Sequence, residues 1–248
     1  MTKYGKRITS ALLAGIALCA SGAAWAEDAA PESAFTLSGS ATVVSQYRFR
    51  GVSLSDEDIA AQAGIGLSHS SGFYIGTWGS NLAGFGTFGG SNVELDLFGG
   101  WKGSAGGVDL DVGLISYQYP GTANTDYLEA YGSIGKAFGP VTGKLGIAYA
   151  FDNGALTDSN TYVYTDWALG ISGAPVTIKA HVGYTDGAFA LGANNLWDYS
   201  IGVDLTVMKG LTFNASYIDT DYSRSGAAFA PLREISDGAF VVSLTASF

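Results

Sequence analysis

The carboxyl-terminal stretch 239–248, AFVVSLTASF, decides the fold class of this chain. Every even position in it is apolar, from Phe240 to Phe248, and the odd positions after Val241 carry serine or threonine. A side-chain period of two predicts a β-strand with one wholly apolar face. Such a strand fits a soluble β-sandwich, and it also fits a barrel whose outer face meets the hydrocarbon of a membrane.

The terminal aromatic residue, Phe248, favours the barrel. Alternation that ends in a carboxyl-terminal phenylalanine is similar to the closing strand of bacterial outer-membrane barrels, which the barrel-assembly machinery recognises. We therefore expect that machinery to be a partner, through the strand that ends in Phe248. After residue 26 the chain has no run of eighteen consecutive apolar residues, so it could cross a membrane only as a closed barrel.

The amino terminus has the organisation of a secretory signal peptide. A basic n-region, an apolar h-region and a small-x-small cleavage site follow one another as Lys3, Lys6 and Arg7, then 8–20, then 24–26. We predict cleavage after residue 26, a short polar lead over 27–34 and a barrel over 35–248. We expect an exported barrel of this kind in the outer membrane of a Gram-negative cell, surrounded by lipid and lipopolysaccharide.

Cysteine and charge content exclude several kinds of site. The single cysteine, Cys19, lies in the predicted signal peptide, so the processed chain is expected to have no disulfide, thiol nucleophile or cysteine-ligated metal. Loss of the three basic signal residues leaves 9 basic against 22 acidic residues, a net charge of −13. That balance argues against nucleic acid as a partner, and we expect no cofactor.

Alternation like that of the last strand recurs along the whole processed chain. The predicted strands are 35–50, 59–69, 73–81, 92–102, 107–119, 127–138, 141–151, 161–172, 176–185, 197–208, 211–219 and 239–248. They number twelve, an even number as single-chain bacterial barrels require, and the odd-numbered residues of the first strand face the lipid. The strand at 73–81 is the least regular, because both of its faces carry aromatic residues.

The connections between the predicted strands sort by length. The long ones are 51–58, 82–91, 120–125, 152–160, 186–196 and 220–238, and the short ones are 70–72, 104–106, 139–140, 173–175 and 209–210. Long and short connections alternate along the chain, so each kind gathers on one side. Outer-membrane barrels place long loops outside the cell and tight turns in the periplasm, and we assign the two sides accordingly.

Aromatic residues of lipid-facing parity gather at both ends of the strands. They are Phe35, Phe73, Trp101, Phe138 and Phe248 at the turn side, and Tyr47, Phe49, Tyr149, Phe151, Tyr184, Trp197, Tyr199, Tyr217 and Phe240 at the loop side. Two such girdles are typical of barrels at the two membrane interfaces, whereas a soluble sandwich gives no reason for them.

Four segments carry a family resemblance. They are SQYRFRGVSLSDED (45–58), SGFYIGTWGSN (71–81), ELDLFGGWKG (94–103) and YQYPG (117–121), and together they resemble the proteobacterial TorF porin family. The resemblance extends over most of the processed chain. It implies a pore-like barrel, and it brings no catalytic residue with it.

Charged residues concentrate on the face opposite the lipid-facing one. This inward set comprises Arg48, Arg50, Glu94, Asp96, Lys102, Asp109, Asp111, Glu129, Lys144, Asp166, Lys179, His181, Asp198 and Asp204. Such a face fits the wall of a water-filled barrel and contradicts a sandwich core. Some of these residues are expected only to pair across the lumen and brace it. Arg48 and Arg50 with Glu94 and Asp96 form the expected bracing group.

The inward set has eight acidic residues against five Lys and Arg, an excess of three negative charges that predicts a modest cation preference. The same face carries aromatic residues near the loop side: Tyr117, Tyr119, Tyr127, Tyr131, Tyr162 and Tyr164. A ring of tyrosines can bind a sugar or an aromatic solute, or it can fill a constriction. We favour filling.

Chemical motifs are sparse. A lipid hydrolase would need a Ser–His pair at the outer leaflet, but His69 ends its strand at the periplasmic side and His181 has lumen-facing parity. We therefore expect His69 to be an interface residue and His181 a hydrogen-bonding residue of the lumen. The acidic run 56–58 lacks the spacing of a calcium loop, so we expect no metal site.

These patterns favour an outer-membrane channel for passive passage of small hydrophilic solutes or ions, without catalysis. The alternative is a plugged barrel with a structural or surface-interaction role.

Overall fold

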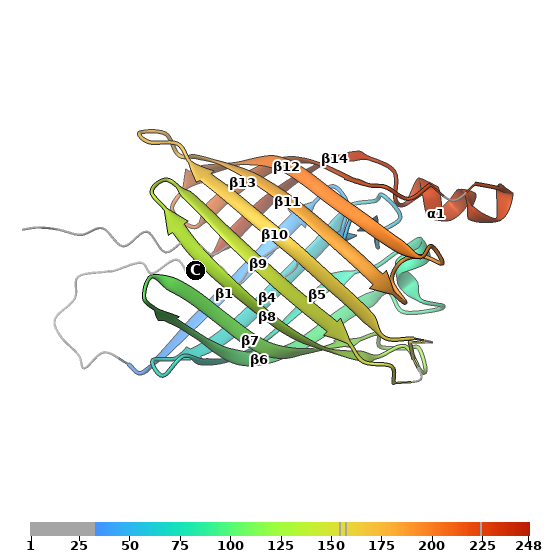
Figure 1. Cartoon of the computed structure of the whole chain (residues 1–248), viewed down its shortest axis with the longest axis horizontal. Helices are drawn as coiled ribbons and strands as arrows, with labels where there is room; N and C mark the ends of the chain where they lie inside the picture. The colour runs from blue at the N-terminus through green and yellow to red at the C-terminus, as the bar shows by residue number, and fades with distance from the viewer. Residues whose placement is uncertain (1–32, 154, 157, 224) are drawn as a thin grey trace, which may run out of the picture.

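Twelve strands close into an antiparallel barrel in the order β1-β14-β13-β12-β11-β10-β9-β8-β7-β6-β5-β4. In this computed structural model, residues 33–153, 155–156, 158–223 and 225–248 are described. The predicted signal peptide and the lead up to residue 32 lie outside the described residues. The strands lean across the barrel axis, as Figure 1 shows. The prediction of a twelve-stranded transmembrane barrel is confirmed.

The observed strands follow the predicted ones closely. They are β1 (Phe35–Val44), β4 (Ala60–His69), β5 (Phe73–Asn81), β6 (Val93–Ala105), β7 (Val108–Gln118), β8 (Tyr127–Phe138), β9 (Val141–Ala150), β10 (Asn160–Gly170), β11 (Val176–Gly187), β12 (Asn195–Met208), β13 (Leu211–Thr220) and β14 (Ala239–Ser247). The irregular segment 73–81 forms strand β5 as predicted. The turn predicted at 104–106 shifts to 106–107, where Gly106 and Gly107 both have positive φ angles.

The connections divide the barrel into two ends. The turn end has the short connections, together with the start of β1 and the carboxyl terminus, whereas the loop end has the long ones (Figure 1). Among the described residues, three short helices lie in the long connections: η1 (Gly84–Thr87), η2 (Ala227–Phe229) and α1 (Ala230–Glu234). Within the described part of the chain, no helix has the length and apolarity needed to cross a membrane.

The first and last strands meet at a seam that closes the barrel. Thr42 and Thr245 form a side-chain hydrogen bond of 2.9 Å across it. At the turn end, Gly39 and Phe248 exchange two backbone hydrogen bonds of 3.2 and 3.1 Å. The Phe248 ring occupies the space above Gly39, because a Cβ atom added to this glycine would lie only 2.5 Å from the ring.

The outer face is apolar and has aromatic residues at both ends. Exposed ones are Phe35, Phe73, Phe138 and Phe248 at the turn end, and Tyr149, Phe151, Trp197, Tyr199 and Phe240 at the loop end. Val241, the one apolar odd position of the carboxyl-terminal strand, faces inward instead and is buried in a cluster with Tyr47 and Trp78. The loop end of the lumen therefore contains an apolar core.

The first predicted strand is wrong over its last six residues. β1 ends at Val44 instead of residue 50, and the chain then forms a small hairpin of β2 (Arg48–Phe49) and β3 (Val52–Ser53). The two residues between them, Arg50 and Gly51, have φ angles of 49° and 83°. Two successive positive φ angles are typical of a type I′ turn, which joins strands of a tight hairpin.

Candidate functional site: the lumen

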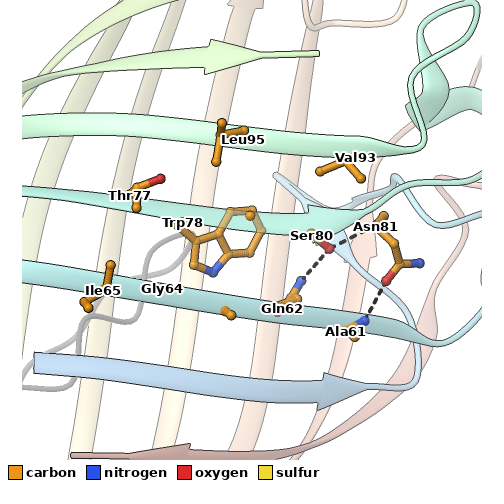
Figure 2. Close-up of a pocket in the computed structure, with 12 residues that line it drawn as sticks. Ala61, Gln62, Gly64, Ile65, Thr77, Trp78, Ser80, Asn81, Val93 and Leu95 are labelled. Atoms are coloured by element: carbon orange, nitrogen blue, oxygen red, sulfur yellow. Dashed lines mark hydrogen bonds between the residues drawn. The ribbon is translucent and has the colours of Figure 1, made fainter. Parts of the chain in front are cut away.

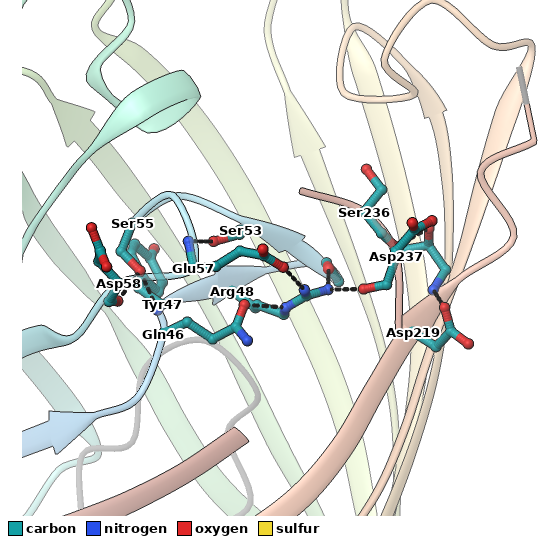
Figure 3. A network of polar contacts seen from close by, with 12 residues as sticks. Gln46, Tyr47, Arg48, Ser53, Ser55, Glu57, Asp58, Asp219, Ser236 and Asp237 are labelled. Carbon is teal, nitrogen blue, oxygen red and sulfur yellow. Dashed lines mark hydrogen bonds and ion pairs between the residues drawn. The ribbon is translucent and has the colours of Figure 1, made fainter. Parts of the chain in front are cut away.

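The hairpin after β1 folds into the barrel instead of extending its wall. We call residues 46–55 the inward hairpin. Its return arm is buried, with Ser53 and Ser55 each at 0% exposure. Figure 3 shows how it lies across the loop end, with Arg48 reaching toward Asp237 of the last long connection. Since its contacts reach inward residues of β5, β6, β7, β8, β10 and β12, the hairpin spans the lumen.

Tyr47 anchors one side of the inward hairpin. Its hydroxyl donates to Glu94 Oε1 at 2.7 Å, and the Tyr119 hydroxyl donates to Glu94 Oε2 at 3.0 Å. The Tyr47 ring packs edge-on against Trp78, with centroids 5.4 Å apart. Burial, and then the charge of Glu94, raise the pKa of the Tyr47 hydroxyl well above its ordinary value. Tyr47 therefore does not belong to the outer aromatic girdle, contrary to the sequence prediction.

Phe49 was also expected in the outer girdle, and it too lies inside. Its ring packs against Tyr117 and Phe189, at centroid distances of 5.8 and 6.2 Å. The reason for both errors is the same. Once the chain leaves the sheet at Val44, the alternation of the strand no longer determines which way a side chain points.

Arg50 occupies the tip of the inward hairpin, in a cage of aromatic rings. Its guanidinium lies 4.2 Å from the centroid of Tyr162, 4.6 Å from that of Phe49 and 5.5 Å from that of Phe189. Its Nη2 atom forms a 2.5 Å ion pair with Glu129. Burial by itself would lower the pKa of Arg50, but the charge of Glu129 acting together with the surrounding tyrosines raises the pKa above its ordinary value. Arg50 is therefore a buried cation.

The bracing group predicted from Arg48, Arg50, Glu94 and Asp96 is wrong. Arg48 donates instead to Gln46 Oε1 and to the carbonyl oxygens of Gly51 and Asp237, each at 2.8 Å, and pairs with Glu57 at 3.5 Å. The physical reason is again the hairpin, which moves both arginines off the wall.

Asp96 forms no ion pair with either arginine of the inward hairpin. It is only 2% exposed, and its Oδ1 atom has no hydrogen-bond partner among the described residues. Glu57, from the acidic run 56–58, is used in the pair with Arg48. Within the described ranges, no group of three acidic, histidine or cysteine residues could hold a metal ion.

Four wall strands carry a connected charge network. Lys144 on β9 pairs with Asp166 on β10 at 2.9 Å. His181 on β11 lies between two carboxylates, with Nδ1 2.6 Å from Asp166 and Nε2 2.9 Å from Asp198 on β12. The Tyr162 hydroxyl also lies 2.8 Å from Nε2, so His181 links this tyrosine to the two carboxylates. Lys179 pairs with Asp204 closer to the turn end.

The predicted tyrosines pack into stacks. Tyr117 and Tyr127 lie parallel with centroids 4.5 Å apart, and Tyr162 and Tyr164 stack at 5.4 Å. Tyr119 extends the first stack at 6.4 Å. These rings fill space between the wall and the inward hairpin.

Tyr131 is not part of either stack. Its hydroxyl forms a 2.6 Å hydrogen bond with Tyr74, whose own hydroxyl is 2.5 Å from Asp111. Sequence reasoning missed Tyr74. The alternation of β5, which gives even-numbered residues inward parity, was the signal that could have found it.

The inward side chains near the turn end are less buried. Lys102 and Asp109 are exposed and Asp111 is half-buried, although all three lie on the inner face. Around them the inner face carries small residues, including Gly100, Ser104 and Ser133. The strand-borne candidates thus lie on the inner face as expected, in two environments. The structure does not test whether they line a path for solutes, so that role stays a prediction.

Two remaining features lie on the outer face. His69 packs against the Phe35 ring at 4.8 Å, and its Nδ1 atom is 2.7 Å from the hydroxyl oxygen of Ser71 in the adjoining turn. Figure 2 shows a shallow groove across β4, β5 and β6, where Ala61 and Asn81 share a hydrogen bond of 2.6 Å. Neither feature reaches the lumen network.

Solved structures with similar folds include two porins, KdgM and NanC. The structure described as "KdgM porin" has a TM-score of 0.59 at 8% identity, over 85% of this chain and 99% of that chain. "KdgM porin in complex with disordered oligogalacturonate" gives the same values. "NanC porin structure in rhombohedral crystal form" has a TM-score of 0.57 at 9% identity, over 86% of this chain and 99% of that chain. At such identities the likeness shows the fold alone.

At the level of sequence, the chain matches one family. No curated protein matches the chain. One family model matches residues 28–248, under the description "Bacterial protein of unknown function (Gcw_chp)". That description does not mention TorF, so the TorF resemblance stays a prediction. Because the match covers nearly all of the chain, the protein belongs to the Gcw_chp family of bacterial proteins of unknown function.

Proposed function

We propose that this protein is an outer-membrane channel for the passive passage of small hydrophilic solutes or ions. The observation that carries the proposal is a closed barrel with an apolar outer face and a charged inner face. Charged groups are costly inside a membrane unless they face water or one another. Lys102 and Asp109 are the clearest case, since they lie on the inner face and are exposed.

The porin neighbours support the same proposal. Their likeness covers 85% of this chain and 99% of the "KdgM porin" chain, so it concerns the complete barrel. In such barrels selectivity comes from the diameter of the lumen and from the charges that line it. Export through the predicted signal peptide and insertion through the strand that ends in Phe248 are part of this proposal.

A modest cation preference follows from the ion pairs. Arg50, Lys144 and Lys179 each neutralise one wall carboxylate. Several inward acids have no basic partner within ion-pair distance in the described part of the chain: Glu94, Asp96, Asp109 and Asp111. An acidic excess in a narrow lumen with low-dielectric walls enriches cations.

The test is electrical recording of the purified protein in a planar bilayer. We expect discrete conductance steps, and under a potassium chloride gradient a reversal potential of the sign that indicates cation preference. Anion preference would overturn the charge argument while leaving the channel standing. No conductance steps at any voltage would overturn the channel itself.

A plugged barrel with a structural or surface-interaction role is the second candidate, and one observation favours it. The inward hairpin fills the loop end of the lumen with buried side chains. The bilayer measurement separates the two candidates, because a permanently plugged barrel gives no current. A lipid hydrolase has less support, since His181 lies in the lumen between two aspartates and His69 lies at the turn end.

A further inference from the structure

We infer that the inward hairpin is the gate of this lumen, and that Arg50 is the latch that holds it shut. The inference rests on the proposed channel function and adds its regulation. A hairpin of this kind can gate passage only if it blocks the path, can move, and is held by contacts that can be broken. The structure bears on each of these three conditions.

The blocking position is defined by contacts on opposite sides of the barrel. Tyr47 touches Trp78 and Glu94, on β5 and β6, whereas Arg50 touches Tyr162 on β10. Gly51 lies against the wall farther on, since an added Cβ atom would be 2.4 Å from Thr220 and 2.9 Å from the Asp198 side chain. The hairpin therefore crosses from one wall to the other at the depth of the acidic residues.

The hairpin can move because its tip is not part of the sheet. β2 and β3 pair only with each other, and residues 48–52 exchange no backbone hydrogen bond with a wall strand in the described structure. The backbone anchors lie at the base and in other loops. Leu54 accepts a 3.1 Å hydrogen bond from Ala83, and Ser53 donates one of 2.8 Å to Ile235. Side chains alone hold the tip against the wall.

Arg50 makes the ion pair that joins the tip to the wall. Its partner Glu129 lies on β8 and also accepts a hydrogen bond of 3.1 Å from the Tyr117 hydroxyl. A charged group held in an aromatic cage and paired with one carboxylate is stable only while both contacts persist. Removing the arginine charge leaves Glu129 buried without a cation, which favours withdrawal of the hairpin.

Opening of the hairpin would also change the charge of the path. While it is seated, Arg50 neutralises Glu129 and Tyr47 binds Glu94. When it leaves, these two carboxylates face the lumen together with Asp96. The open state therefore has a stronger cation preference than the closed one.

The first test measures hairpin movement without using transport. Val52 is buried on the return arm, and the predicted processed chain has no other cysteine. We compare the labelling rate of Val52→Cys by a small water-soluble maleimide in three backgrounds: otherwise unchanged, with Arg50→Gln, and with Arg233→Gln on α1 as the matched control. Heat-dependent gel migration checks that each variant is a folded barrel.

The gate predicts at least several-fold faster labelling with Arg50→Gln and an unchanged rate with Arg233→Gln. Arg50→Lys, which keeps the charge, should label more slowly than Arg50→Gln. Equal rates in all backgrounds would overturn the gate, whatever the conductance. This readout is therefore independent of the proposed function.

The second test records Arg50→Gln and Glu129→Gln in planar bilayers. Both variants should spend more time conducting than the unmodified protein, and Arg50→Gln should show a reversal potential shifted toward stronger cation preference. If the unmodified protein conducts and Arg50→Gln leaves gating unchanged, the latch role of Arg50 is wrong and the channel function is supported. If Arg50→Gln labels faster but no variant conducts, the channel is wrong and the gate falls with it.

Discussion

In the loop-side half of the lumen, the wall residues Glu94 and Glu129 are almost completely buried, whereas in the turn-side half Lys102 and Asp109 are exposed. Both halves are built from the same strands with the same inward parity, since Glu94 and Lys102 lie eight residues apart on β6. The wall pattern therefore cannot explain the difference. What differs is the inward hairpin, which fills one half and does not reach the other.

Strand alternation therefore determines which residues face the lumen, whereas a loop determines how much of the lumen is filled. A barrel of twelve strands has little spare room once side chains fill it. A ten-residue segment at one end can then fill half of the lumen. The orientation of the barrel and the extent to which the hairpin fills the lumen can be tested separately.

Labelling on intact cells tests whether the loop end of the barrel is the outer end. Ser225 lies in the longest connection and Ser172 in a short turn on the opposite side. We expect a membrane-impermeant thiol reagent on intact cells to label Ser225→Cys and to spare Ser172→Cys. Permeabilised cells, in which both should react, provide the control. Equal labelling on intact cells would contradict the assigned orientation.

Replacing the tip of the inward hairpin removes the difference between the halves. We expect a variant with residues 48–53 exchanged for a short Gly-Ser linker to have a several-fold larger single-channel conductance, because the contacts of Arg50 and Phe49 across the lumen are lost. A control exchange of Ala227 and Ala228, exposed on the last long connection, should leave the conductance unchanged. A conductance that does not change in the linker variant would mean that the narrowest point lies elsewhere.

The turn end has no hairpin to support it, so its seam should be sensitive to overpacking. In Gly39→Ala the new Cβ atom would lie 2.5 Å from the outer end of the Phe248 ring, and because this exposed ring can turn aside we expect a loss of about 1 kcal/mol of unfolding free energy. Urea unfolding in lipid vesicles measures the loss. Gly135→Ala is the matched control, since its Cβ would have its nearest contact at 3.7 Å. Adding Phe248→Ala should recover part of the loss.

The smallest expected effect concerns an exposed charge in the open half. Asp109→Asn removes one negative charge from water-filled lumen, so cation preference should fall slightly at low salt. At 1 M salt the Debye length shrinks to about 3 Å, and the variant should become indistinguishable from the unmodified protein. Reversal potentials at 0.1 M and 1 M potassium chloride measure both. An equally large effect at both concentrations would contradict an open, aqueous turn-side half.

The barrel could be predicted from the sequence because its strands and turns depend on residues that are close together along the chain. Alternation identified every strand of the barrel wall, including 73–81, and glycine- or proline-containing turns separated them. The lipid-facing parity of Phe240 and Trp197 followed directly from the same period. For these residues the nearest neighbours along the chain already determine the environment.

The inward hairpin could not be predicted in this way, because YRFR at 47–50 continues the alternation of β1. Tyr47 and Phe49 keep lipid parity, and Arg48 and Arg50 keep lumen parity, although none of them lies in the wall. One signal was available. A strand over 35–50 would be longer than the roughly 9–11 residues that a tilted strand needs to cross a membrane. The partners of Arg50 lie on strands far away in the sequence, so the residues around Arg50 do not predict these contacts.

The seam also has a consequence for the order of assembly. Ser45, the residue from which the inward hairpin departs, donates its backbone N–H to Val242 at 2.9 Å and accepts the Val242 N–H on its side chain at 3.0 Å. These two residues are 197 positions apart, so the pivot of the hairpin has no partner until the final strand has been delivered. Contacts of such long separation form late, after most of the chain has been ordered. We therefore expect the nascent barrel to remain unplugged through most of its maturation, and a chain that lacks β14 to leave its hairpin open to proteases.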